Sequence, residues 1–260
     1  MKLQILITTI KLTFELTPII DIMFDLYQKP RTFERFKEYI ATLEGGKKGD
    51  LTLPIGGFNP MAKEHVMDKL RELKNLNAEQ LIKDTLKELN DGHPVKENAN
   101  TFKVALNLSD DLKGGWTNRY TSDYDSKFKI NGIMNRNFCI PIFWSSENYT
   151  EQLIKNRTRE YCYRTIYRLT TPKPETLEEH ILQEKFVYEK SKTLSSTKVN
   201  FNELQLFYQK NKDTTDYVTI FNFLYGDEAT ASLGNKTLGI SDEFAGDEFA
   251  KQLATKNIKI

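Results

Sequence analysis

The chain has 260 residues, with 37 Lys and Arg against 36 Asp and Glu, so its formal net charge is +1 at pH 7. Hydrophobic residues make up 39% of the sequence, which excludes a disordered chain, and 2 cysteines cannot frame a disulfide scaffold. A nearly neutral chain also gives no general reason to bind nucleic acid or an anionic membrane.

The sequence also bears on the compartment. No stretch approaches the roughly 20 consecutive apolar residues that cross a bilayer, so we expect no membrane partner. The apolar start, residues 1–10, lacks the small-residue cleavage site of a signal peptide, and Cys139 and Cys162 fit reduced core thiols. These features predict a cytoplasmic protein.

The N-terminal part, residues 17–92, is expected to be helical. Apolar residues recur at helical spacing over residues 17–44, where Pro30 separates two helices. Asn59 and Pro60 predict the start of a third helix, because Asn is a favoured N-cap and Pro a favoured first helical residue. A fourth helix is predicted to start at Asn77 and to stop at Asp91-Gly92.

The middle part, residues 101–144, changes to a strand pattern. Apolar and polar residues alternate from Phe102 to Leu108, which predicts a half-buried strand. Residues 120–130 predict a loop with an edge strand. The apolar run 138–144 predicts a further strand, and its Pro141 suits a sheet edge or a strand end.

The C-terminal part, residues 146–260, is expected to be helical again. Ser145-Ser146-Glu147 predicts the cap of a long helix that reaches Leu169, Thr176 caps the next, and Asn200 or Asn202 starts another. Residues 218–225 fit a buried helix or a strand. No repeat or Ser/Gly linker divides the chain, so we predict one α+β domain over residues 1–260, predominantly helical around a small central β-sheet.

Two polar stretches suggest a binding site. Residues 54–65 place a Gly-Gly loop before a helix start with Asn59 and Lys63, an arrangement that can cradle an anion or can simply form a turn and a cap. Residues 110–120 follow a predicted strand and combine Trp116 and Arg119 with amide and hydroxyl groups. That composition suits a pocket for a polar molecule, or a hairpin turn around a packed Trp.

A third stretch, residues 176–184, raises the question of a metal. His180 and Glu184 are four residues apart on a predicted helix and could share a metal ion, with Glu179 in the adjacent row and His65 as a distant third ligand. The alternative is an exposed His–Glu pair on a charged helix. Because a complete ligand set is missing, no metal ligand is assigned.

A fourth feature is an arginine stripe. Arg157, Tyr161, Arg164 and Arg168 recur at helical spacing, in a segment with more basic than acidic residues. This pattern favours an anionic ligand or, alternatively, a solvated face whose arginines pair with acidic side chains elsewhere.

From these patterns we predict a pocket for a small polar or anionic molecule. The ligand-binding candidates are Asn59, Lys63, Trp116, Asn118, Arg119, Tyr120, Arg157 and Arg164, and the candidates for proton transfer are His65, Glu179 and His180. A shared pocket requires Arg119, Trp116 and Lys63 to lie within about 15 Å of one another.

Two other functions are compatible with the sequence. One is a non-enzymatic module that contacts a protein or RNA through exposed aromatic and arginine side chains, although the neutral total charge disfavours nucleic acid. The other is a metal-dependent hydrolase that uses His180 and Glu184. The sequence indicates no particular cofactor or oligomeric state, and it leaves open whether the protein is an enzyme.

Overall fold

A computed structural model describes residues 12–44, 50–54, 58–62, 64–92, 100–112, 117–195 and 199–256. By its internal contacts the chain divides into two compact units, Met1–Cys162 and Tyr163–Ile260, and each is described by itself. The prediction of one domain over residues 1–260 stays a prediction.

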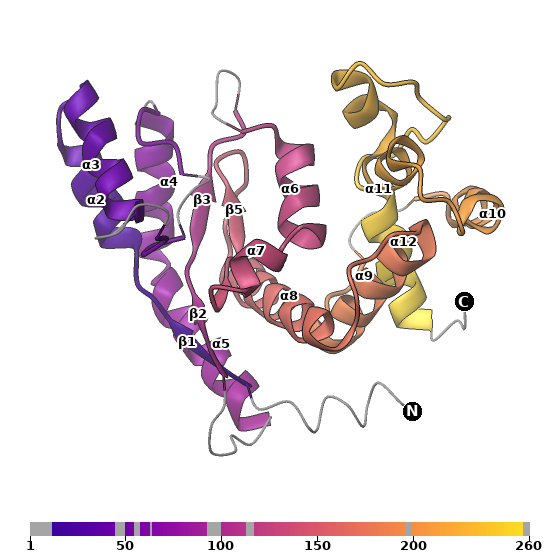
Figure 1. Ribbon diagram of the computed structural model, residues 1–260, viewed down its shortest axis with the longest axis horizontal. Coiled ribbons are helices and arrows are strands. Elements are labelled where there is room, and N and C mark those ends of the chain that lie inside the picture. The colour runs from indigo at the N-terminus through magenta and orange to yellow at the C-terminus, as the bar shows by residue number, and fades with distance from the viewer. Residues whose placement is uncertain are drawn as a thin grey trace. The chain divides into compact units, whose positions relative to one another are not determined.

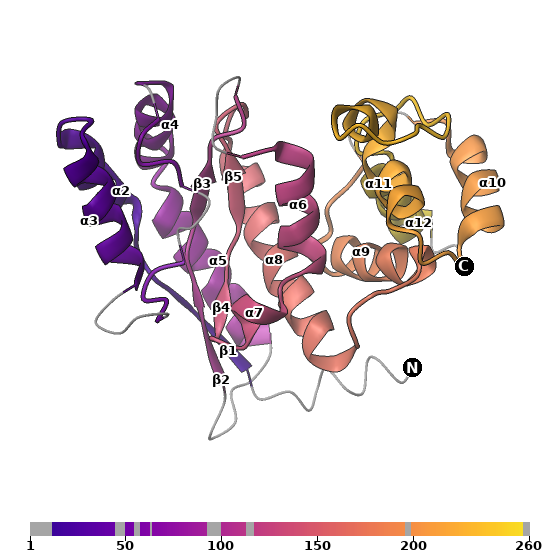
Figure 2. The ribbon, with the colours of Figure 1, turned by 45° about the horizontal axis from the view of Figure 1, so that its top comes forward.

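The first unit is built on parallel strands. β1 (Leu12–Leu16), β2 (Asn100–Val104) and β4 (Phe138–Cys139) form a sheet in the order β1-β2-β4, and β3 (Asn107–Ser109) pairs with β5 (Ile142–Trp144). The pairing of β2 with β4 continues into the pairing of β3 with β5. Between them, Ala105 N–H donates to the Cys139 carbonyl and Asn107 N–H donates to the Pro141 carbonyl. β3 and β5 lie side by side in both views (Figures 1 and 2).

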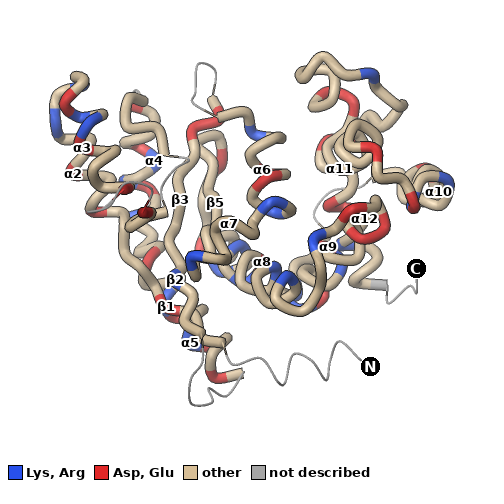
Figure 3. Tube along the Cα trace, in the orientation of Figure 1, with Lys and Arg blue, Asp and Glu red and all other residues tan. Residues whose placement is uncertain are grey.

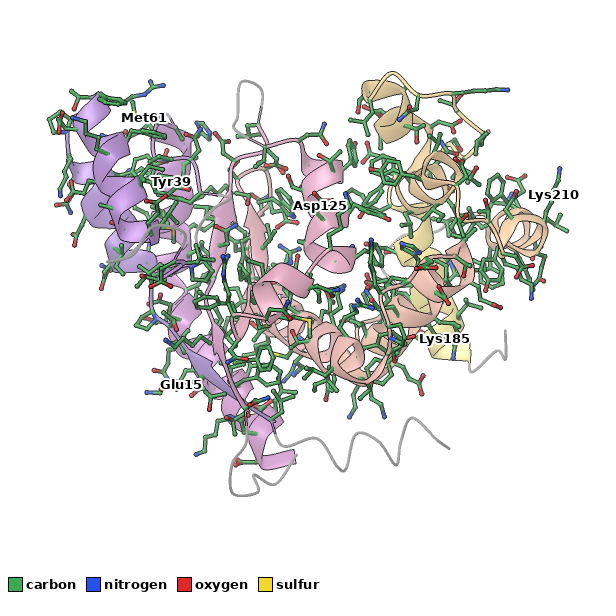
Figure 4. All side chains as sticks on the ribbon, viewed as in Figure 1. Glu15, Tyr39, Met61, Asp125, Lys185 and Lys210 are labelled. Atoms are coloured by element: carbon green, nitrogen blue, oxygen red, sulfur yellow. The ribbon has the colours of Figure 1, made fainter. Side chains whose placement is uncertain are left out.

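Helices connect these strands, as the parallel pairing requires. Four lie between β1 and β2 in the chain: α2 (Ile20–Gln28), α3 (Phe33–Glu44), α4 (Glu64–Asn75) and α5 (Ala78–Gly92). Two more, α6 (Arg119–Phe128) and α7 (Asn131–Met134), lie between β3 and β4, and α8 (Glu151–Thr170) follows β5. Leu12 and Phe14 of β1 point into the core, whereas Glu15 on β1 and Asp125 on α6 are exposed (Figure 4).

The second unit is helical in its described residues. It contains α9 (Leu177–Ser191), α10 (Phe201–Asn211), α11 (Tyr217–Ser232) and α12 (Ala245–Lys256), together with the end of α8. Rings of Tyr208, Phe223 and Phe249 pack at its centre, with centroids 5.4–6.1 Å apart. Gly226 interrupts α11 with φ +85°, and a Cβ there would lie 2.4 Å from the Asp242 carbonyl oxygen, so only glycine fits.

Most predicted elements are confirmed. The chain has the predicted α+β class, helices on both sides of Pro30, strands within residues 138–144, and a helix capped by Thr176. The single strand predicted from Phe102 to Leu108 is present as two strands, β2 and β3. The stretch 218–225, whose sequence fits either a buried helix or a strand, is helical.

Four details differ from the prediction. Residues 120–130 form α6 instead of a loop and edge strand, because the Asn118 side chain accepts from Thr121 N–H and starts a helix. β1 lies just before the predicted helical part, at residues for which no element was predicted. The helix predicted from Asn59 begins at Glu64, and the one predicted after Ser145 begins at Glu151, because the intervening polar side chains form tertiary hydrogen bonds.

Candidate functional site

The candidate site lies where β3 and β5 end. Ser109 and Trp144, the last residues of the two strands, are register partners, and Ser145 N–H donates to the Ser109 carbonyl at 2.9 Å. The segments that follow, residues 110–112 and 145–147, therefore leave the sheet at the same edge. Figure 3 shows acidic positions at these strand ends and a basic one at the start of α6. In sheets of parallel strands this carboxyl edge is the usual place for ligands.

Asp110 is the centre of this site. Its side chain is buried, and its Oδ1 accepts a hydrogen bond from His65 Nε2 and another from the Ser145 hydroxyl, each at 2.9 Å. Its Oδ2 accepts a longer bond from the Asn59 amide at 3.3 Å. Since a buried carboxylate is costly without donors, these three side chains make its position possible.

The neighbouring Asp111 shares the Ser145 hydroxyl, 3.2 Å from its Oδ1, and has further donors of its own. Its Oδ1 accepts from Ser146 N–H at 3.0 Å, and its Oδ2 accepts from the Ser146 hydroxyl at 2.7 Å and from Arg119 at 3.1 Å. Arg119 also donates to Glu147 at 3.0 Å and lies 5.4 Å from the centre of the Trp144 ring. Arg119 therefore bridges the segment after β3 and the segment after β5.

Glu147 is shared by two arginines. Arg157 of α8 donates to both of its oxygens, in one case at 3.0 Å, and Arg119 donates to one of them. Burial alone would raise the pKa of the Glu147 carboxyl, but the charge and hydrogen bonds of Arg157, helped by Arg119, hold that pKa below its ordinary value. Glu147 is thus a carboxylate that fixes two cations.

One face of α4 follows these strand ends. His65, Lys69 and Glu72 stand at i, i+4 and i+7, and each contacts the segments after β3 or β5. His65 binds Asp110, Lys69 Nζ donates to the Glu147 carbonyl at 2.5 Å, and Glu72 accepts from Tyr149 N–H at 2.7 Å. The helix is thereby held in register with the sheet edge.

Side chains of α2 and α3 hold the turn before α4. The Tyr27 hydroxyl donates to the Asn59 carbonyl, and Arg35 donates to the Pro60 carbonyl at 3.3 Å. Burial, with a contribution from the Asp110 charge, raises the pKa of Tyr27 above its ordinary range, so the hydroxyl keeps its proton and remains a donor. These contacts orient Asn59 toward Asp110.

The structure brings four of the predicted site residues together. Asn59, His65, Arg119 and Arg157 all belong to the network around Asp110 and Glu147. Asn118 caps α6, and Tyr120 is half-buried in the first turn of that helix. Lys63 and Trp116 lie outside the described residues, so the distance condition for a shared pocket stays a prediction.

The other three predicted residues belong to the second unit. Arg164 and Glu184 form a buried ion pair, with N–O distances of 2.8 and 2.6 Å. Glu179 completes the capping box of α9, and the His180 Nδ1 donates to the Thr176 carbonyl at 2.7 Å. Burial lowers the pKa of His180, although the Thr176 bond and nearby Glu179 and Glu184 act in the opposite direction. Each of these side chains has a place in the packing of α8 and α9.

Metal ligation can be judged from the same contacts. Within the described ranges, no group of three or more His, Cys, Asp or Glu side chains is arranged to hold a metal ion. Both Glu184 oxygens accept from Arg164, which leaves that carboxylate committed to an ion pair.

Five residues of the site are not among the individual residues predicted from the sequence: Asp110, Asp111, Ser145, Ser146 and Glu147. Only their position in the sequence indicates a role, because they follow directly on predicted strands. The carboxyl ends of neighbouring parallel strands meet at one edge of a sheet. The row His65, Lys69 and Glu72 gives no separate signal, because α4 also carries charged residues on its exposed face, such as Asp68 and Arg71.

Comparison with protein-family models, with curated proteins and with solved structures finds no match. In the part of the chain that the structure describes, no helix is both long and apolar enough to cross a membrane.

Proposed function

We propose that the ends of β3 and β5 bind a small polar molecule and that His65 exchanges a proton with it. One observation carries this proposal: His65 Nε2 contacts the buried Asp110 at 2.9 Å, while about a third of the His65 side chain, 33%, is exposed. Among the described residues, no partner occupies the other ring nitrogen, Nδ1.

The chemistry follows from the tautomer that Asp110 selects. A carboxylate accepts hydrogen bonds, so Nε2 carries the proton and the lone pair of a neutral ring stands on Nδ1. An exposed, oriented imidazole lone pair is a suitable general base. Asn59 and Ser145 hold the Asp110 carboxylate and so support the ring indirectly.

The arginine stripe gives less support to an RNA-binding module. Tyr161, Arg164 and Arg168 are buried, and only 18% of the Arg157 side chain is exposed. A nucleic-acid backbone needs accessible cations, which these side chains do not supply. As part of the same proposal we place the protein in the cytoplasm, which the two buried free thiols, Cys139 and Cys162, support.

Acylation of histidine by diethyl pyrocarbonate tests the proposal, because the reagent attacks an unprotonated ring nitrogen. His65 should react rapidly in the wild type and more slowly in Asp110→Asn, where the amide can reverse the tautomer and place a proton on Nδ1. Asp68→Asn, an exposed carboxylate on the same helix, is the matched control and should leave the rate unchanged. The rate is measured by mass spectrometry of the His65 peptide, with buried His180 as the slow internal reference. Equal His65 rates in wild type and Asp110→Asn would refute the proposed role of Asp110.

A further inference from the structure

The charges around His65 favour one class of ligand. The site holds three carboxylates, those of Asp110, Asp111 and Glu147, and two guanidinium groups. Arg119 contacts Asp111 and Glu147, Arg157 contacts Glu147, and Asp110 contacts His65. The adjacent Lys69 and Glu72 form an ion pair and cancel one another. Among the described charged side chains that contact the segments after β3 and β5, a neutral His65 ring therefore leaves an excess of one negative charge.

Neither guanidinium is positioned to receive an anion in place of these carboxylates. Arg119 is bound to Asp111 and Glu147 at 3.1 and 3.0 Å, and Arg157 holds Glu147 with two of its nitrogens. Each guanidinium also lies against an aromatic ring, Trp144 or Phe143, at 5.4 and 5.2 Å. A phosphate or carboxylate would have to displace these partners, and the released carboxylates would then repel it.

His65 offers the ligand an accessible acceptor, with 33% of its side chain exposed, whereas the guanidinium group of Arg119, 29% exposed, is held by two carboxylates. The His65 Nδ1 lone pair needs a donor from the ligand, and a primary ammonium supplies both the donor and the opposite charge. We propose that the site takes a small molecule with a primary amine and discriminates against phosphates and carboxylates. This inference rests on the proposed function, and it replaces the anionic ligand expected from the arginine stripe.

Three small probes test it on the full chain: ethanolamine, ethylene glycol and inorganic phosphate, at matched ionic strength. The readout is the NMR signal of the His65 ring. We expect a saturable shift of this signal with ethanolamine. Because the site carries one excess negative charge at close range, ethylene glycol should bind about tenfold more weakly than ethanolamine, and phosphate more weakly still. Glu64→Gln removes an exposed carboxylate from the same helix and serves as the control that keeps this order.

The outcomes separate the two proposals. Tighter binding of phosphate, abolished in Arg119→Gln, would overturn the amine preference and leave the proposed site standing. Equal affinities for ethanolamine and ethylene glycol would show that the excess negative charge does not favour the amine, and would overturn the amine preference. If none of the three probes shifts the His65 signal, the proposed function fails together with the inference.

Discussion

Removal of the Glu147 carboxylate is the most informative single change in the first unit. Glu147→Gln keeps the shape of the side chain but deprives Arg119 and Arg157 of their common partner. Breaking a buried ion pair from one side typically costs about 3–5 kcal/mol. Because 18% of the Arg157 side chain is exposed and Arg119 keeps Asp111, we expect the lower end, about 3 kcal/mol.

The assay is urea unfolding followed by tryptophan fluorescence, to which the buried Trp144 beside Arg119 contributes. Glu151→Gln is the matched control, since the exposed Glu151 pairs with Lys155 at 3.5 Å and should contribute less than about 0.5 kcal/mol. Equal free energies of unfolding for the two variants would refute the view that Glu147 is a buried anchor.

The same variant has a defined pH dependence. The pKa of Glu147 is lowered in the folded protein from its ordinary 4.5, so the unfolded chain takes up the proton first as the pH falls. The stability that the carboxylate contributes is therefore complete above about pH 4.5 and is lost as the pH falls through the folded pKa. We expect the difference between wild type and Glu147→Gln to shrink in acid. A constant difference from neutral pH to below the folded pKa would contradict this linkage.

Three further predictions concern other parts of the chain. Glu184→Gln should destabilise the second unit by about 3–5 kcal/mol, and joint replacement of Arg164 and Glu184 by Met and Leu should recover most of the loss, as a double-mutant cycle would show. Asn90→Ala should cost about 1–3 kcal/mol in urea unfolding and speed hydrogen exchange at Phe14, since the Asn90 amide bonds both backbone groups of that β1 residue. Because the pKa of His180 is lowered from 6.5, the free energy of unfolding should fall as the pH drops below that value, and His180→Gln should flatten this dependence. A double-mutant cycle with no coupling energy between Arg164 and Glu184 would contradict the first prediction. Unchanged hydrogen exchange at Phe14 in Asn90→Ala would contradict the second, and an unchanged pH dependence in His180→Gln would contradict the third.

The fold could be predicted where local signals were strong. Thr176 with Glu179 forms the predicted capping box, and Pro141 ends one strand segment between β4 and β5. β1 was missed although Leu12, Phe14 and Leu16 alternate with polar residues, because a strand of five residues is too short to outweigh its helical neighbours.

The site was predictable only in part, because its parts meet through tertiary pairing. His65 and Arg119 were selected for their chemistry, but their partners Asp110 and Glu147 become neighbours only when β3 and β5 pair in parallel. Nothing in local spacing links residue 65 to residue 110. Arg164 lies on the same predicted stripe of α8 as Arg157, so the sequence does not distinguish the two. In the structure Arg164 belongs to the second unit, where it pairs with Glu184.

The position of the His65 proton tests the proposed site most directly. A long-range ¹⁵N–¹H correlation spectrum, recorded at about pH 8.5, well above the ordinary titration range of imidazole near 6.5, distinguishes the two neutral tautomers. The contact with Asp110 predicts the Nε2–H tautomer in the wild type and a shift toward Nδ1–H in Asp110→Asn. A predominant Nδ1–H form in the wild type would contradict the account, because His65 would then have no lone pair to offer a ligand.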